Sequence, residues 1–320
     1  MAAPSDGTVE PASASRGRAF LRHAGWWTTL KAAAKTPRGA TGLALTAFVV
    51  AVAAIGPFVS PHSGQAFVTT PFAPPSIAPP LGGDVLGRDV LSRVLEGGWT
   101  LLPVAFAATA FGIVVGSAAG ISAAYLRGTA DGLIMRTVDV LLAFPQLVLV
   151  LLLLSIIGPK LWLIIVAVGL AHAPQVARVL RAATLDISER DYVKAIELQG
   201  VRPVKVMTKE ILPNLTTPLM VESGLRLTYS IVIIAGLSFL GFGQAPNIPN
   251  WGTMVNENRL GLETNPWAVI VPGLLIVLFA IGTNTFTDAI ARVAIGVEHR
   301  PQELAEVADP DEESWLEASV

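Results

Sequence analysis

Six long apolar runs limit what this chain can fold into more than any other feature of its sequence. Five of them contain no Asp, Glu, Lys or Arg, at residues 42–59, 97–126, 140–159, 161–177 and 264–287. The sixth, at 227–242, is equally free of charge, and its helix is expected to begin near Thr216. Because about 20 apolar residues cross the hydrocarbon core of a bilayer, the runs predict an all-α membrane protein. The predicted spans cover about residues 42–60, 98–126, 134–158, 161–182, 216–242 and 265–290.

The composition agrees with membrane insertion and argues against a soluble body. Hydrophobic residues make up 52% of the 320 residues and charged residues 14%, whereas typical globular domains are about 25% charged. The formal net charge of −2 gives no electrostatic support for nucleic-acid binding. The chain has no cysteine, which excludes disulfides and thiolate metal sites.

The distribution of basic residues predicts the orientation of the spans. If the N-terminus is cytoplasmic, seventeen of the 22 Lys and Arg residues fall on the cytoplasmic side, and the outer loops hold four. This asymmetry follows the positive-inside rule. It places both termini in the cytoplasm, together with the charged segment between the fourth and fifth spans.

Two tails flank the predicted transmembrane domain at residues 41–297. Residues 1–40 are rich in Ala, Ser, Pro and Gly and are expected to be a mostly disordered cytoplasmic tail. Trp26 and Trp27 fit either a membrane interface, where aromatic side chains gather, or a solvated tail. Residues 298–320 carry a strong excess of acidic side chains and are expected to be a solvated cytoplasmic tail.

The charged segment at residues 188–214 predicts a helix–turn–helix between two spans. Ser188 stands three residues before an acid, which is the spacing of a helix start. Gly200 can adopt the left-handed conformation that ends a helix. Pro203 suits the first turn of a second helix, and Pro213 is expected to end it. The residues expected to line one face of each helix are Tyr192, Ala195, Ile196, Gln199, Val204, Met207 and Ile211.

Small residues and prolines in the spans favour close packing of bent helices. Gly112, Gly116 and Gly120 recur every four residues and leave a flat stripe for helix contact. Prolines within the spans lie at residues 103, 145, 174, 218 and 272. Ordinary packing of a helix bundle accounts for both features, which fit a transporter without requiring one.

The spans lack the dense set of ionisable side chains that a proton relay needs. Charged residues near the span ends are expected to reach water there; they are Asp139, Asp186, Glu222, Arg226 and Asp288. His172 lies well inside a span and is expected to have a hydrogen-bonded structural role. The four histidines are too scattered for an obvious metal site.

The sequence carries no motif for ATP hydrolysis or metal-dependent catalysis. It has no glycine-rich loop followed by Gly-Lys-Ser/Thr, so it lacks a phosphate cradle and is not an ATPase alone. It also has no His-Glu-x-x-His motif. We therefore predict no catalytic residue, no metal ligand and no cofactor in this chain, and we do not expect an enzyme.

Two loops are expected on the outer side of the membrane. The loop at residues 60–96 is rich in proline up to Pro80 and ends in a short amphipathic helix that starts at Asp89. The loop at residues 236–259 is dense in Gly, Pro and Asn, which favours a structured turn over a continuous helix.

The segment at residues 188–214 resembles the cytoplasmic coupling loop of binding-protein-dependent ABC importer permeases. That family's pattern is roughly Glu-Ala-Ala, three residues, Gly, about nine residues, and then an apolar residue before Leu-Pro-Asn. Five residues match it in place and spacing: Ala195, Gly200, Leu212, Pro213 and Asn214. Lys194 stands where an acid is common, and Lys209-Glu210 stands where a basic residue and a His are usual. The ATPase contact is therefore expected to depart from the usual pattern.

Further segments are similar to the second permease of dipeptide/oligopeptide and nickel importers. One is Leu-Gly-Arg-Asp-Val-Leu-Ser-Arg at residues 86–93, and another is Leu-Ser-Phe-Leu-Gly-Phe-Gly at residues 237–243. The remaining matches are Pro249, Trp251, Gly252, Asn265, Pro266, Trp267, Pro272, Gly273, Asp288 and Ala289. The resemblance covers about residues 40–300.

The resemblance implies a six-helix type I ABC importer transmembrane domain, multi-pass in the bacterial plasma (inner) membrane. It also implies a homologous permease as heterodimer partner, two ATP-binding subunits that bring ATP and Mg²⁺, and an extracytoplasmic substrate-binding protein. The residues implied in ATPase coupling are Asp191, Tyr192, Ala195, Glu197, Gly200, Arg202, Leu212, Pro213 and Asn214. Those implied in contact with the binding protein are Arg88, Asp89, Arg93, Trp251 and Asn256. For Arg88 and Asp89, capping the helix of the second span is an equal alternative.

The resemblance implies short peptides as cargo, with nickel, glutathione and haem-like compounds as alternatives. An ATPase-independent transporter, a channel and a membrane scaffold are the competing classes of function. Stoichiometric ATPase subunits in the purified protein favour the importer, and autonomous transport in liposomes favours its rivals. Substrate-stimulated ATP hydrolysis excludes the scaffold.

Overall fold

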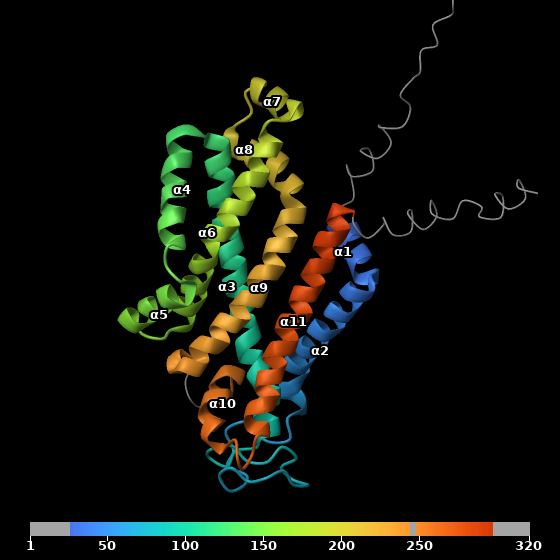
Figure 1. Cartoon of the computed structure of the whole chain (residues 1–320), viewed down its shortest axis with the longest axis vertical. Helices are drawn as coiled ribbons and strands as arrows, with labels where there is room; N and C mark the ends of the chain where they lie inside the picture. The colour runs from blue at the N-terminus through green and yellow to red at the C-terminus, as the bar shows by residue number, and fades with distance from the viewer. Residues whose placement is uncertain (1–25, 244–247, 297–320) are drawn as a thin grey trace, which may run out of the picture.

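The structure is a computed structural model that describes residues 26–243 and 248–296. Within these residues every regular element is a helix, apart from two isolated β-bridges (Figure 1). The α-helices are α1 (Trp26–Lys35), α2 (Pro37–Val59), α3 (Val90–Leu126), α4 (Gly128–Leu142), α5 (Gln146–Ile157), α6 (Leu161–Ser188), α7 (Asp191–Leu198), α8 (Pro203–Val206), α9 (Thr216–Leu237), α10 (Trp251–Asn258) and α11 (Trp267–Ile295). The predicted acidic tail at 298–320 lies outside the described residues.

Five helical segments are long and apolar enough to cross a membrane. They are Pro37–Val59, Val90–Leu126, Leu161–Ser188, Pro203–Phe242 and Trp267–Ile295. The predicted span at 134–158 is not one straight helix, because α4 and α5 meet at an angle of 86°. Pro145 lies at the break, where it lacks an N–H donor and disfavours helical geometry in the residue before it. In the described residues there are thus five continuous candidate spans, and a bent pair of helices stands where the third was predicted.

The glycine stripe predicted on α3 packs against α6 along the centre of the bundle. Gly112 faces Gly169, Gly116 faces Ala173, and the third glycine of the stripe faces Ala177. From one contact to the next, the position increases by four residues on both helices, so α3 and α6 run parallel. A Cβ atom at position 116 would lie 2.6 Å from the Ala173 carbonyl oxygen. The backbones approach too closely for any larger residue, as the stripe predicts.

A buried polar chain joins α9 to α6 and to the start of α5. The Arg226 guanidinium donates to Glu222 Oε2 at 3.1 Å and to Gln175 Oε1 at 2.6 Å. Gln175 Oε1 also accepts from Gln146 Nε2 at 2.7 Å. Arg226 and Glu222 are both buried, so the prediction that they reach water from a span end is wrong. They lie inside the helix packing, where each charge has its partner one turn away.

His172 differs from its predicted role. Its side chain is fully buried on α6, next to the backbone of Gly112 on α3. Within the described part of the chain neither ring nitrogen has a hydrogen-bond partner. The expected hydrogen-bonded role is therefore wrong, because the imidazole is buried in the bundle without a partner among the described residues.

Residues 26–40 are more ordered than their composition predicts, and residues 1–25 of the predicted tail lie outside the described residues. Residues 26–40, expected within a disordered tail, form α1 and the first turn of α2. Ala33 of α1 is buried against Ala289 and Ile290 of α11. Thr36 caps α2 by accepting a hydrogen bond from the Gly39 N–H at 3.0 Å. Packing of one apolar face on α11 supplies the order that local composition does not indicate.

The bundle has two distinct polar ends. Helix α7 lies at one end, and residues 60–89 lie at the other together with α10 and residues 259–266 (Figure 1). We call this second group of residues the cap. Its helix α10 forms where a turn was predicted, because the Asn250 side chain caps it by accepting from the Gly252 N–H. The chain does leave the preceding helix as predicted, at Gly241 with φ of 89°.

Candidate coupling loop and the cap at the opposite end

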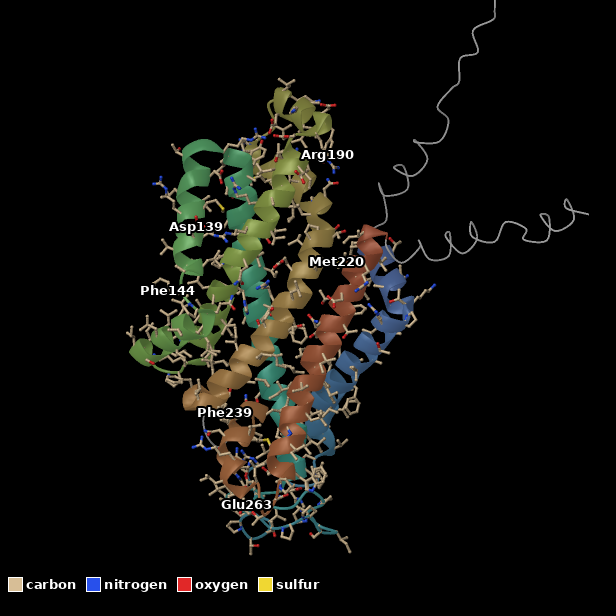
Figure 2. All side chains as sticks on the ribbon, viewed as in Figure 1. Asp139, Phe144, Arg190, Met220, Phe239 and Glu263 are labelled. Atoms are coloured by element: carbon tan, nitrogen blue, oxygen red, sulfur yellow. The ribbon has the colours of Figure 1, made fainter. Side chains whose placement is uncertain are left out.

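Residues 188–214, the candidate coupling loop, form two short helices at one end of the bundle. Figure 2 shows Arg190 at this end and Glu263 in the cap at the other. Helix α7 begins after Arg190, so Ser188 is not its cap as predicted. Ser188 instead ends α6, and its hydroxyl donates to the Thr184 carbonyl at 2.6 Å. Helix α7 has no side-chain cap, and its N-cap residue is Arg190.

The turn between the two helices depends on Gly200, as the sequence predicts. Its φ is 75°, in the left-handed region that glycine adopts without strain. Its N–H donates to the Glu197 carbonyl at 2.9 Å. No heavy atom lies within 4 Å of the position that a Cβ would occupy. A side chain at this position would therefore project away from the protein.

The second helix continues directly into α9 and does not end at Pro213 as predicted. Pro203 opens α8, and a π-helical turn at Met207–Ile211 and a 3₁₀ turn at Leu212–Leu215 follow it. Pro213 has no N–H and cannot make the regular bond to the residue 209 carbonyl. The π-helical and 3₁₀ turns accommodate the missing hydrogen bond, so α8 and α9 belong to one helical segment, Pro203–Phe242.

The inner side of the coupling loop is an apolar cluster on the ends of three long helices. Its fully or mostly buried members are Ile121, Val176, Leu180, Ile187, Val193, Val206, Ile211 and Leu215. Tyr192, Ile196 and Met207 pack against it as predicted. Ala195, Gln199 and Val204 were predicted on the same faces but are exposed. Helix α7 is only about two turns long and α8 about one turn, so a small rotation moves these positions outward.

Polar contacts hold the coupling loop together and join it to α3. The Asn214 amide donates to the Tyr192 hydroxyl at 3.2 Å and to the Glu210 carbonyl at 2.6 Å. The Tyr125 hydroxyl near the end of α3 lies beside the Glu197 carboxylate. Two of the residues predicted for coupling, Tyr192 and Asn214, are thus brought together across 22 residues of sequence. Glu197 thus joins the loop to α3, in addition to the apolar cluster on its inner side.

The outer side of the coupling loop combines charges with two exposed apolar residues. Its exposed predicted residues are Asp191, Ala195, Glu197, Gly200, Arg202, Pro213 and Asn214. Lys194 and Lys209, which depart from the family pattern, are also exposed. Leu198 is 89% exposed and Val204 is 66% exposed, and neither was predicted on this face. In the sequence, the signal available for this face was a leucine between the polar residues Glu197 and Gln199.

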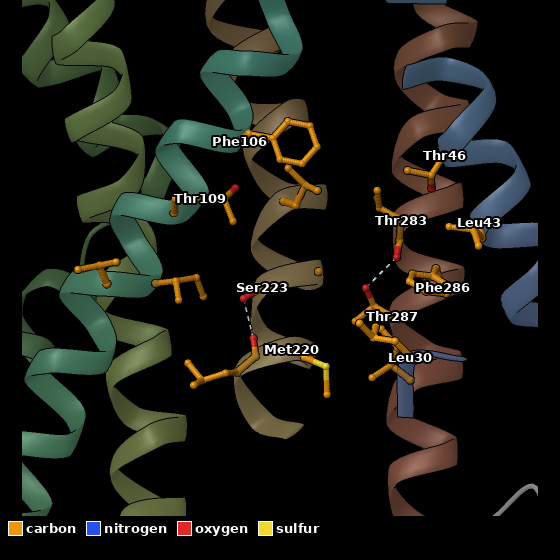
Figure 3. Close-up of a pocket in the computed structure, with 17 residues that line it drawn as sticks. Leu30, Leu43, Thr46, Phe106, Thr109, Met220, Ser223, Thr283, Phe286 and Thr287 are labelled. Atoms are coloured by element: carbon orange, nitrogen blue, oxygen red, sulfur yellow. Dashed lines mark hydrogen bonds between the residues drawn. The ribbon is translucent and has the colours of Figure 1, made fainter. Parts of the chain in front are cut away.

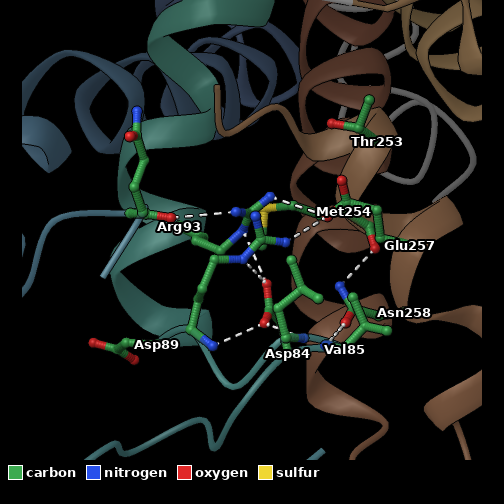
Figure 4. Close-up of polar contacts among 12 residues, drawn as sticks. Asp84, Val85, Asp89, Arg93, Thr253, Met254, Glu257 and Asn258 are labelled. Atoms are coloured by element: carbon green, nitrogen blue, oxygen red, sulfur yellow. Dashed lines mark hydrogen bonds and ion pairs between the residues drawn. The ribbon is translucent and has the colours of Figure 1, made fainter. Parts of the chain in front are cut away.

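A network of buried ion pairs holds the cap together (Figure 4). Asp84 lies between two arginines, 2.6 Å from Arg88 Nε and 3.4 Å from Arg93 Nε. Glu257 of α10 contacts the same arginines at 2.9 and 3.1 Å. Asn258 accepts from the Val85 N–H at 2.8 Å. These contacts join the loop after α2, the start of α3 and α10 into one unit.

The other residues predicted to contact a binding protein also have structural contacts in the cap. Asp89 caps α3 by accepting from the Leu91 N–H, and its carboxylate also contacts His62. Trp251 is buried, and its indole N–H donates to the Val94 carbonyl at 2.8 Å. Asn256 accepts from Arg259 at the surface. The contact with a binding protein stays a prediction, for which Asn256 offers the most accessible side chain of the five.

Sequence reasoning missed the partners that complete the cap. Asp84, Glu257 and Asn258 supply the acceptors described above, and the Asn265 amide donates to the Leu81 and Gly83 carbonyls. Leu-Gly-Arg-Asp at residues 86–89 marked this loop through the family resemblance but did not indicate these distant partners. In the described residues no group of three or more His, Cys, Asp or Glu side chains is arranged to hold a metal ion.

Comparison with known proteins shows where this architecture occurs. The family described as "Binding-protein-dependent transport system inner membrane component" matches residues 112–294. A putative peptide transport system permease protein of Brucella suis is 34% identical over 253 residues, covering 79% of this chain and 85% of that protein. A dipeptide transport system permease protein, DppC, of Alkalihalophilus pseudofirmus is 28% identical over 284 residues, covering 88% and 93%.

One solved structure has a similar fold. It is an inward-facing form of the MetNI methionine ABC transporter, with a TM-score of 0.51 and 20% sequence identity. The similarity covers 63% of this chain and 96% of that chain.

Proposed function

Because this chain belongs to the family of binding-protein-dependent transport system inner membrane components, we propose that residues 188–214 couple it to partner ATPases. The chain is a permease subunit of an ABC importer, and its all-α fold is the type I fold of such permeases. Its relatives are named peptide and dipeptide transport permeases. We propose short peptides as the cargo of this chain on that basis.

One observation carries the coupling proposal. The coupling loop rests its apolar side on the ends of α3, α6 and α9, and it turns its charges and two apolar residues outward. Such a surface suits a protein partner, because exposed apolar residues ringed by charge are typical of docking sites. Movement of a docked partner would tilt the three long helices together and open or close the path between subunits.

The rest of the assembly follows from this assignment. A homologous permease completes the path as heterodimer partner, two ATPase subunits bind the coupling loops, and an extracytoplasmic binding protein delivers the peptide to the cap side. ATP and Mg²⁺ bind to the ATPase subunits, and this chain performs no catalysis. The coupling loop and both termini face the cytoplasm of the bacterial cell, in agreement with the positive-inside distribution of Lys and Arg.

The test of coupling is a bulky residue at the turn of the loop. Gly200→Trp should abolish peptide uptake while leaving the subunit in the membrane, because the indole projects outward into the docking surface. Uptake by membrane vesicles and co-purification of the ATPase subunits are the measurements. Full uptake with an intact complex would show that the coupling assignment is wrong.

Two variants separate docking from backbone strain. Gly128 also has a positive φ of 58°, is exposed, and has no heavy atom within 4 Å of the position that its Cβ would occupy. Gly128→Trp therefore imposes the same strain outside the coupling loop and should retain uptake. Gly200→Asn tolerates the left-handed conformation with little bulk and should retain most of it.

The cargo is tested separately from the coupling. Dipeptides presented by the cognate binding protein should stimulate ATP hydrolysis by the assembled complex. Stimulation only by nickel, glutathione or a haem-like compound would change the cargo and leave the coupling assignment intact. Autonomous transport by this chain in liposomes, without ATPase subunits, would instead favour an ATPase-independent transporter or channel.

A further inference from the structure

A cavity of about 660 Å³ lies between α3 and α9 on one side and α2 and α11 on the other (Figure 3). Its volume is in the range of about 300–1,000 Å³ that small-molecule sites occupy. Phe106 and Ala110 line it from α3, Met220 from α9 and Phe286 from α11. Leu30 of α1 lines it as well. Its lining residues Phe106 and Val114 are exposed, so the cavity is open to the surroundings of the bundle and reaches the amphipathic helix α1.

The hydroxyl groups in the cavity wall are already used by their own helices. Thr46 donates to the Gly42 carbonyl at 2.9 Å, and Ser223 donates to the Leu219 carbonyl at 2.6 Å. Thr109, Thr283 and Thr287 each donate to the carbonyl four residues earlier at 2.8 Å. The wall thus offers hydrocarbon with few free donors. It is poorly suited to the charged ends and amides of a peptide, whose burial requires partners.

The surface beside the cavity carries an excess of positive charge. Lys31 directly follows the lining residue Leu30, and Lys35 and Arg38 are exposed within the next two turns of chain. On α11, Arg292 and Asp288 are exposed and offset each other. Basic side chains on an amphipathic helix favour anionic lipid surfaces. Trp26 and Trp27 are exposed on the same helix, with ring centroids 4.0 Å apart, as interfacial aromatic residues are.

We propose that this cavity binds an acyl chain of an anionic phospholipid, whose phosphate lies near Lys31, Lys35 and Arg38. The apolar wall accounts for the acyl chain, and the basic residues account for the negative headgroup. The site is distinct from the coupling loop and from the cap. It would fasten α1 and α2 to α9 through a lipid, in a part of the bundle where side chains leave space.

Lipid binding to the full chain tests the proposal. The chain is purified in mild detergent with the subunits that co-purify with it, and native mass spectrometry follows binding of dioleoyl-phosphatidylglycerol and dioleoyl-phosphatidylcholine. Their acyl chains are identical and only the headgroups differ. We expect phosphatidylglycerol to bind at least about tenfold more tightly, since several basic residues near the headgroup add their attractions. Equal affinities in the wild-type chain would overturn the proposal.

Two kinds of variant separate the headgroup from the acyl chain. The triple change Lys31→Glu, Lys35→Glu and Arg38→Glu should remove the preference for phosphatidylglycerol. Arg136→Glu, at an exposed position on α4, should leave it unchanged. Ala110→Trp fills the cavity and should weaken both lipids about tenfold. Ala118→Trp, an exposed α3 position outside the cavity, should weaken neither.

Other occupants of the cavity give different results. Displacement of the bound lipid by a dipeptide would assign the cavity to the cargo. Loss of the lipid when the homologous permease joins the complex would assign it to the subunit interface. Unchanged lipid binding in Ala110→Trp would show that the lipid binds elsewhere. Each of these results would overturn the proposal.

Discussion

The two polar ends of this permease use charged residues in opposite ways. In the cap and the adjoining start of α3, Asp84, Arg88 and Arg93 are turned inward and fully or nearly fully buried, and Asp84 and Glu257 each pair with both arginines. In the coupling loop, charges such as Lys194 and Glu197 are turned outward, and the buried side is apolar. Both ends of the bundle carry charged side chains, but these point into the protein in the cap and into solvent in the coupling loop. The cap is held by buried contacts of its own, and the coupling loop leaves its charges exposed to the ATPase partner that we propose.

The difference has an energetic consequence that mutation can reveal. Removing one partner from a buried ion pair leaves an uncompensated charge and costs about 3–5 kcal/mol. Removing one exposed charge changes stability by about 0–1 kcal/mol. Mutations in the cap should therefore lower the stability of the protein. Mutations in the coupling loop should instead lower transport.

The largest effect on stability is expected at the centre of the cap. Asp84→Ala removes the carboxylate between Arg88 and Arg93 and should lower the free energy of unfolding by about 3–5 kcal/mol. Unfolding by denaturant in mixed micelles measures it. Glu263→Ala is the matched control, since Glu263 is an exposed acid of the same cap, and it should cost less than about 1 kcal/mol. Equal effects of the two variants would contradict a structural role for the network.

Asp89 should give a smaller effect that also separates its two predicted roles. Asp89→Ala removes the side chain that accepts a hydrogen bond at the N-terminus of α3, and it should lower the free energy of unfolding by about 0.5–2 kcal/mol. Asp89→Asn keeps an oxygen that can accept this bond and should lower it by less. Denaturant unfolding measures the stabilities, and peptide uptake is compared in the same two variants. A loss of uptake in a stable Asp89→Asn variant would favour contact with the binding protein over capping.

The sequence predicts those parts of the molecule that depend on short-range pattern. The apolar runs locate the long helices, the glycine stripe on α3 follows from a four-residue repeat, and the turn at Gly200 follows from its backbone freedom. Each of these signals lies within a few turns of the chain. For this reason the turn of the candidate coupling loop could be predicted from the sequence alone.

The cap and the bent helix pair were not predictable in the same way. Arg88 and Glu257 are 169 residues apart in sequence, and no local pattern indicates that they meet. The break at Pro145 could be expected, but its angle of 86° depends on how α5 packs beyond it. Burial of Arg226 likewise depends on Gln175 of another helix. The ion pair, the angle at the break and the burial of Arg226 all depend on contacts with segments that are distant in the sequence.

Within the coupling loop, the internal hydrogen bond should have a modest effect on stability. Tyr192→Phe removes the hydroxyl that accepts from Asn214, and it should cost about 0.5–1.5 kcal/mol. Denaturant unfolding measures it, and the ratio of peptide uptake to ATP hydrolysis reports on coupling. We expect the ratio to fall, because α7 is less firmly held to the segment that precedes α9. An unchanged ratio with lower stability would limit this contact to a structural role.

The smallest effect on stability and a large effect on assembly are expected at the exposed apolar residues of the coupling loop. Leu198→Asp and Val204→Asp should change the free energy of unfolding by no more than about 0.5 kcal/mol, because both side chains are already in solvent. Both should weaken co-purification of the ATPase subunits, because central apolar contacts carry much of the energy of a docking site. Leu260→Asp is the matched control, since Leu260 is 84% exposed in the cap, and it should leave ATPase binding unchanged. If all three variants retained the ATPase subunits equally, the outward face of the coupling loop would lose its distinction from the cap, and the docking surface would have to lie elsewhere on the bundle.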